Sequence, residues 1–139
     1  MDETNNELIQ VVAGVNVKYI NDVPHVLLGL KPRGIWEFPG GKIEYKETHP
    51  QALEREWMEE LGVNIIIQEK RFGHVRNGMY DIWFYDVDVD EVFGTQEPTA
   101  KEHVEVKYFK LSDLDSGDVK LHMNDTNQVM IKKLIMLYR

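Results

Sequence analysis

The order of hydrophobic and polar residues along the chain first predicts a pair of strands. Residues 8–20 are rich in Val and Ile with mixed alternation, and residues 24–30 form a second apolar stretch. Asn21-Asp22 lies between them, and this pair of residues is typical of a tight turn. We therefore expect two strands joined by a short loop.

A second pair of strands is predicted in the middle of the chain. Residues 64–76 and 79–90 flank Asn77-Gly78, which is a strong short-range signal for a hairpin. In residues 79–90, apolar side chains point to both sides of the strand. A strand that is apolar on both faces is expected to be central, with a layer packed on each side.

Helical patterns occur twice, and one further strand lies between them. Good helix formers run from Gln51 to Leu61, Pro50 is tolerated in a first turn, and Gly62 is a natural stop. Residues 91–100 are expected to be an exposed loop, and the alternation over 101–111 predicts a strand. The last helix is expected to begin near Asp125-Thr126, either of which can cap it. Its inward stripe is formed by Ile131, Leu134 and Tyr138, with Asn127 one turn earlier.

Length and composition narrow the class of protein. The 139 residues predict a single domain spanning 1–139, with a polar segment at 1–7 that is expected to fray. The absence of cysteine excludes disulfides and thiolate chemistry. A net charge of −8 disfavours a nucleic-acid surface, which needs clustered Lys and Arg. No apolar run suggests a membrane span or a signal peptide, so we expect a cytoplasmic protein.

Three carboxylates on the first helix suggest a metal site. At about 100° per residue, Glu56, Glu59 and Glu60 share one arc beside the apolar arc of the helix. Arg55 is at helical spacing from Glu59 alone, so the carboxylates repel one another by about 0.2–0.5 kcal/mol per pair unless a cation is bound. Oxygen ligands of this kind suit Mg²⁺ or Mn²⁺. A solvated acidic helix face is the alternative explanation.

The spacing around this helix resembles the signature of the Nudix hydrolase family. That signature is Gly, five residues, Glu, seven residues, Arg-Glu, an apolar residue, any residue, Glu-Glu, any residue, Gly and an apolar residue. The positions that match it are Gly41, Glu47, Arg55, Glu56, Trp57, Glu59, Glu60, Gly62 and Val63. Trp57 is bulkier than the usual aliphatic residue. The resemblance implies an α/β fold, an α/β/α sandwich with a central mixed β-sheet.

Further site residues follow from the same resemblance. Residues 36–44 resemble the MutT-like branch of the family, in which a backbone carbonyl at the Gly41 position completes the metal shell. The resemblance also implies that Glu47 orients Arg55. Lys46 stands where that branch usually has Gly. In the late strand, Glu102 fits a metal-binding Glu by its distance from Tyr108, and Glu105 is the alternative.

Substrate-binding candidates lie before and after the signature. Lys31 and Arg33 form a basic turn that can grip phosphate oxygens, and Phe38 lies in the run that leads into the signature. Asn127 offers a donor and an acceptor, as a base edge requires, and its surroundings resemble the MutT segment whose Asn reads the purine. A local cap is the alternative role for Asn127. The histidines show no metal-ligand spacing and are expected to be ordinary surface or strand residues: His25, His49, His74, His103 and His122.

These residues predict metal-assisted hydrolysis of a phosphoanhydride, with one of Glu59, Glu60 or Glu102 as the base. The resemblance implies cleavage of a nucleoside triphosphate such as dGTP, 8-oxo-dGTP or a related dNTP to monophosphate and pyrophosphate. Another nucleoside diphosphate derivative, namely ADP-ribose, a dinucleoside polyphosphate or a 5′-triphosphate RNA end, remains an alternative substrate. A silent nucleotide-binding module is the alternative from a different class. A monomer and a homodimer are both compatible with the sequence.

Overall fold

The computed structural model describes residues 8–92 and 94–139, apart from the side chain of residue 70. The strands are β1 (Ile9–Val15), β2 (Val17–Ile20), β3 (Val23–Leu30), β4 (Trp36–Glu37), β5 (Gly40–Lys42), β6 (Ile65–Asn77), β7 (Tyr80–Val89) and β8 (Glu105–Lys110). The helices are α1 (His49–Leu61), α2 (Leu111–Ser116) and α3 (Asp125–Leu137). The predicted fraying of residues 1–7 lies outside the described residues.

The strands form two four-stranded sheets. One has the order β5-β1-β7-β6, and the parallel pairing of β1 with β7 makes it mixed. In the other, β3 pairs with β2 and β4 and also with β8. The central position predicted for β7 is confirmed, because β1 and β6 flank it on either side.

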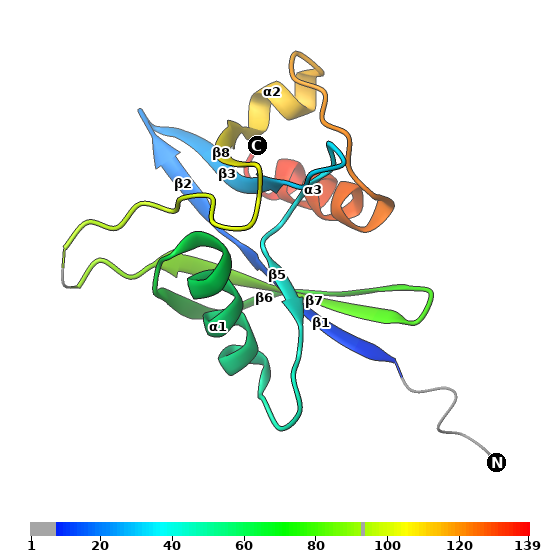
Figure 1. Ribbon diagram of the computed structural model, residues 1–139. Helices are drawn as coiled ribbons and strands as arrows, with labels where there is room; N and C mark the ends of the chain where they lie inside the picture. Colours follow the sequence, from blue (N-terminus) through cyan, green and yellow to red (C-terminus); the bar gives the residue numbers. More distant parts are fainter. Residues whose placement is uncertain (1–7, 93) are drawn as a thin grey trace.

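Helices cover the strands on both sides, as Figure 1 shows. One apolar core joins α1 to the first sheet through residues such as Leu53, Trp57 and Val87. The other core packs α3 against the opposite face and includes Phe84 of β7 and Met130 of α3. The predicted α/β/α arrangement is therefore confirmed. Within the described residues, no helix combines the length and apolarity needed to cross a membrane.

Both predicted pairs of strands are present, with corrections elsewhere. Asn21 and Asp22 have positive φ and connect β2 to β3, and Gly78, with φ 62°, opens the turn between β6 and β7. The first stretch is split at Asn16, whose buried side chain donates to the carbonyl of Val87 instead of facing solvent. The late strand begins at Glu105 rather than at residue 101, and the short helix α2 was not predicted.

Helix α1 has the start and stop that its sequence predicts. Thr48 caps it reciprocally with Gln51, and Gly62 ends it in the left-handed conformation with φ 69°. The bulky Trp57 is fully buried, and its indole N–H donates to the carbonyl of Pro39 at 3.1 Å. It fits because residue 14 is glycine, where a Cβ would lie 2.5 Å from the indole nitrogen.

Helix α3 begins as predicted, but its cap is a different residue. Asn124 is the N-cap, and its side-chain oxygen accepts the backbone N–H of Asn127 at 3.0 Å. The inward positions of Asn127, Ile131 and Leu134 are confirmed, because all three are buried. The capping role therefore belongs to Asn124, which leaves the amide of Asn127 for another use.

A strained turn precedes α1. The backbone N–H of Glu47 bonds to the carbonyl of Glu44 at 3.0 Å, and Lys46 occupies the third position of this turn with φ 67°. That position favours glycine, because a Cβ crowds the following carbonyl when φ is positive. Lys46 is therefore held in a conformation that costs it free energy.

We expect Lys46→Gly to stabilise the protein by about 0.5–1 kcal/mol, since relief of the left-handed strain exceeds the entropy that glycine adds to the unfolded chain. The midpoint of thermal unfolding should rise by a few degrees. Lys46→Ala is the matched control, because it removes the same side chain but keeps the Cβ. An equal gain from both variants would show that the strain is not the cause.

Candidate functional site

A cavity of about 420 Å³ lies between the first sheet, the β3–β4 connection, the segment before β8 and the start of α3. Apolar side chains of Phe38 and Ile82 form part of its wall, and polar groups converge on it from the other elements. Those polar side chains are Lys31, Glu37, Lys42, Glu60, Glu102, His103, Asn124, Thr126 and Asn127. A cavity in which polar groups converge beside apolar wall residues is a usual form of a small-molecule site.

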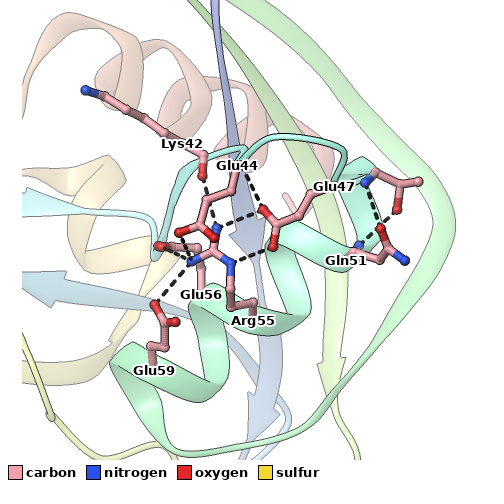
Figure 2. A network of polar contacts seen from close by, with 8 residues as sticks. Lys42, Glu44, Glu47, Gln51, Arg55, Glu56 and Glu59 are labelled. Atoms are coloured by element: carbon pink, nitrogen blue, oxygen red, sulfur yellow. Dashed lines mark hydrogen bonds and ion pairs between the residues drawn. The ribbon is translucent and has the colours of Figure 1, made fainter.

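Beside the cavity, Arg55 binds carboxylates that precede α1 and carboxylates that belong to it (Figure 2). Its Nε donates to one oxygen of Glu47 at 2.6 Å, and its Nη2 donates to the other at 3.0 Å. Its Nη1 donates to Glu56 at 3.0 Å and to Glu59 at 3.2 Å. The guanidinium therefore holds three carboxylates from two different segments in one arrangement.

Two more contacts fix Arg55 from the side of β5. Glu44 lies 3.6 Å from Nη1, and Nη2 also donates to the carbonyl of Lys42 at 3.2 Å. Hydrogen bonds from Arg55 and then from the backbone N–H of Glu44 lower the pKa of Glu47. The same bond to Glu47 raises the pKa of Arg55. These shifts favour the ionised form of both Glu47 and Arg55, and the bond to the Lys42 carbonyl ties α1 to β5, which contains Gly41.

Glu60 is the carboxylate that lies inside the protein. Its residue is only 6% exposed, and its Oε1 is a buried atom without a hydrogen-bond partner. Burial, followed by the Glu56 carboxylate beside it and the charges of Glu37 and Glu102, raises the pKa of Glu60 to about 9. A buried acid with an unused oxygen at a cavity wall has the environment of a ligand for a cation.

Glu37 and His103 are among the cavity residues that were not predicted from the sequence. Nε2 of His103 lies 2.8 Å from Oε2 of Glu37 and 3.9 Å from the free Oε1 of Glu60. The prediction that His103 is an ordinary surface or strand residue is wrong, because its side chain is 4% exposed and it precedes β8. Glu37 and His103 are 66 residues apart, so no local sequence pattern predicts the contact between them.

The donor atoms of the site fit a hard divalent cation. Carboxylates of Glu56 and Glu60 lie together, and the unpartnered oxygen of Glu60 needs a positive partner. A Cβ on Gly41 would collide with the Glu56 carboxylate, so glycine lets the backbone of β5 approach the acids closely. Oxygen donors of this kind suit Mg²⁺ or Mn²⁺.

The structure brings most of the predicted site residues together. The cavity wall contains Gly41, Glu60, Glu102, Lys31, Phe38 and Asn127. The adjoining Arg55 cluster contains Glu47, Arg55, Glu56 and Glu59. Arg33 is exposed and is not part of the cavity wall, whereas Lys31 is part of it and lies 3.8 Å from Glu37.

Comparison with known proteins gives one family. The model of the NUDIX domain matches residues 14–134. A CTP pyrophosphohydrolase from Escherichia coli is 39% identical over 75 residues, which are 50% of this chain and 53% of that protein, so the match spans about half of the relative. An 8-oxo-dGTP diphosphatase from Haemophilus influenzae is 31% identical over 81% of this chain and 84% of the relative.

A solved structure from a study of MutT from Aliivibrio salmonicida and Vibrio cholerae is similar over nearly the whole chain. Its TM-score is 0.76 at 27% identity, and the alignment covers 95% of this chain and 100% of that one. The similarity therefore includes the two sheets and the helices that surround the cavity.

The raised pKa of Glu60 predicts how pH changes the stability of the metal-free protein. The acid ionises near its ordinary value when the chain is unfolded but stays neutral up to about pH 9 when folded. The unfolded state therefore releases this proton first, and the free energy of unfolding falls as pH rises between those two values. Glu60→Gln removes this loss, so at pH 8 in EDTA the variant should be more stable than the parent by roughly 1–3 kcal/mol.

The advantage of Glu60→Gln should shrink towards pH 5, as measured by urea unfolding across the pH range. Glu59→Gln is the control, because Glu59 is half exposed and its bond to Arg55 is worth about 0.5 kcal/mol or less. A difference between Glu60→Gln and the parent that is the same at pH 5 and pH 8 would contradict the assignment.

Proposed function

The chain belongs to the NUDIX family, and on that premise we propose that it hydrolyses a nucleoside triphosphate to the monophosphate and pyrophosphate. A purine deoxynucleotide such as 8-oxo-dGTP or dGTP is the proposed substrate, and residues 1–139 act as one catalytic domain. The observation that carries the proposal is the continuity of the site. Glu60, Glu102 and Gly41 share one cavity with Phe38 and Asn127, so carboxylates for a metal-bound phosphate chain adjoin a chamber for a base.

The metal site of this proposal is made by Glu56, Glu59, Glu60 and Glu102 together with the carbonyl of Gly41. A divalent cation held there, Mg²⁺ or Mn²⁺, supplies neutralisation of the phosphate charge and acidification of a water. Arg55 does not contact the substrate in this scheme. It fixes the positions of Glu56 and Glu59, and Glu47 in turn fixes Arg55.

The remaining residues are assigned to binding the phosphates, accepting the proton of the attacking water and binding the base. Lys31 reaches the cavity and binds phosphate oxygens, and the exposed Arg33 assists from the rim of the same turn. Glu60 and Glu102 face the cavity, whereas Glu59 is bonded to Arg55 outside it. We therefore assign proton acceptance from the attacking water to Glu60 or Glu102 in preference to Glu59.

Recognition of the base is assigned to Phe38 and Asn127. Phe38 is 3% exposed and packs edge to face on Phe84, so its position is fixed before a ligand binds. Asn127 is buried at the cavity, and Asn124 already caps the helix, so the amide of Asn127 can bond to a base edge. An amide presents both a donor and an acceptor, which suits the Watson–Crick or Hoogsteen edge of a purine.

A second candidate is a cytidine triphosphate. The relative that is 39% identical over half of the chain is a CTP pyrophosphohydrolase, and a cytosine edge also offers a donor beside an acceptor. The bond that is cleaved and the products are the same in both candidates. Only the base pocket distinguishes them.

We expect pyrophosphate to be the leaving product. With Mg²⁺, the protein should release phosphate from a triphosphate only when inorganic pyrophosphatase is added, and EDTA should abolish the signal. The panel contains 8-oxo-dGTP, dGTP, CTP, dCTP, ADP-ribose, a dinucleoside polyphosphate and a 5′-triphosphate RNA. Activity on none of the triphosphates would refute the proposal, and monophosphate formation from the other compounds would then separate another hydrolase from a silent nucleotide-binding module.

Asn127→Ala tests the assignment of the base pocket. Loss of a hydrogen bond to a base edge should lower kcat/KM for the preferred purine by about tenfold or more and should lower the ratio of purine to pyrimidine kcat/KM. Gln128→Ala is the control, since Gln128 is the exposed neighbour and its amide bonds to the carbonyl of Met123. An unchanged ratio in Asn127→Ala would show that another residue reads the base.

A further inference from the structure

His103 lies in a closely fitted slot beside the carboxylates. Its imidazole packs on Gly29 of β3, where a Cβ would lie 2.6–2.7 Å from three ring atoms. Its Nε2 is bonded to Glu37, the last residue of β4, at 2.8 Å. The ring therefore has one position, set by the backbone of β3 on one side and by a carboxylate of β4 on the other.

The segment around His103 is attached at both ends. The N–H groups of Thr99 and Lys101 donate to the carbonyls of Leu61 and Glu60 at 3.0 Å each, which satisfies two carbonyls at the end of α1. On the other side of His103, the N–H of Val104 donates to the carbonyl of Leu30 at 2.8 Å. The segment thus bridges the end of α1 and the end of β3.

Glu102 lies between these attachments, directly before His103. It is exposed, it lines the cavity, and its charge contributes to the raised pKa of Glu60. None of the hydrogen bonds or ion pairs of the described residues holds the Glu102 side chain itself. Its approach to the other carboxylates therefore depends on the backbone on either side of it, where His103 provides the one buried side chain.

The tautomer of the His103 imidazole follows from its surroundings. Nδ1 is buried and has no hydrogen-bond partner among the described residues, whereas Nε2 faces Glu37. A proton on Nδ1 would be a buried donor without an acceptor, which costs more than an unused lone pair. In the neutral imidazole the proton therefore lies on Nε2, which donates to Glu37.

This arrangement disfavours metal binding through Nε2 of His103, the ring nitrogen that faces Glu37 and Glu60. A histidine that binds a metal through Nε2 must carry its proton on Nδ1, and such ligands usually donate that proton to a carboxylate or carbonyl. Here Nδ1 has no such acceptor. Nε2 lies 3.9 Å from Oε1 of Glu60, so the ring is adjacent to a carboxylate of the proposed metal site.

We propose that His103 is a positioning residue, which through its hydrogen bond to Glu37 fixes the 99–104 segment and so holds Glu102 against the carboxylates of α1. The proposal rests on the proposed metal site but not on the identity of the nucleotide. It assigns to His103 and Glu37 an effect on metal affinity that is exerted through Glu102.

Two amide substitutions separate this role from simple packing. In His103→Gln the amide nitrogen reaches about as far as the imidazole Nε2 and can still donate to Glu37. In His103→Asn the same group ends near the position of Nδ1 and cannot reach Glu37. Binding of Mn²⁺ alone, without nucleotide, is measured by the loss of the electron paramagnetic resonance signal of free Mn²⁺.

His103→Asn is expected to weaken Mn²⁺ binding by about tenfold, the lower end of the usual effect of outer-shell partners, and His103→Gln by roughly threefold or less. Both variants are repeated with Glu102→Gln present. If His103 acts through Glu102, the difference between the Gln and Asn variants should fall to within about twofold in that background. Circular dichroism and thermal unfolding establish that each variant is folded. If His103→Asn does not fold, Gly29→Ala replaces it, because the added Cβ displaces the ring while the donor remains.

Three results would overturn the proposal. The first is Mn²⁺ binding by His103→Asn, or by Gly29→Ala where that replaces it, that equals the parent. The second is a difference between the Gln and Asn variants that persists in the Glu102→Gln background. The third is nitrogen coupling to bound Mn²⁺ in the resonance spectrum, which would make His103 a ligand. A parent protein that binds Mn²⁺ with the expected pattern but hydrolyses no nucleotide would refute the proposed function and leave this inference intact.

Discussion

The bonds of Arg55 are the interaction on which the site depends. One guanidinium carries five N–H donors in a fixed plane, and here those donors serve Glu47, Glu56, Glu59 and a backbone carbonyl at once. A lysine at this position would provide a point charge without that geometry. Because Arg55 compensates the outer carboxylates, the acidic face of α1 can fold before any cation binds.

Glu60 is beyond the reach of this compensation. No bond from Arg55 extends to it, and its Oε1 stays without a partner inside the protein. The folded chain therefore carries an unfavourable group at the cavity wall, where an incoming cation gains most. Stability given up at a functional site for binding is a common trade-off in natural proteins, and Glu60 is where this chain shows it.

The sequence predicted what is encoded locally. The period of 3.6 placed the carboxylates on one arc, and Asn77-Gly78 and Gly62 marked a hairpin and a helix end, because each depends on residues close in the chain. The bond between Glu37 and His103 and the fit of Trp57 against Gly14 join distant segments, so no local pattern contains them. The same reason explains Lys31, which reaches the cavity while Arg33 does not, since loop geometry decides between them.

The chemical and recognition parts of the site have different origins, and one turn couples them. Most of the carboxylates come from residues 41–60, whereas the chamber proposed to hold the base is assembled from β1, β7, the β4–β5 turn and α3. Phe38 belongs to that turn and Gly41 to the strand β5 that follows it, and the Trp57 indole bonds the intervening Pro39 to the buried face of α1. A base on Phe38 and phosphates near Gly41 would therefore lie at a separation that the core of α1 fixes. Changes elsewhere in the chamber can alter which base fits while the carboxylates stay in place.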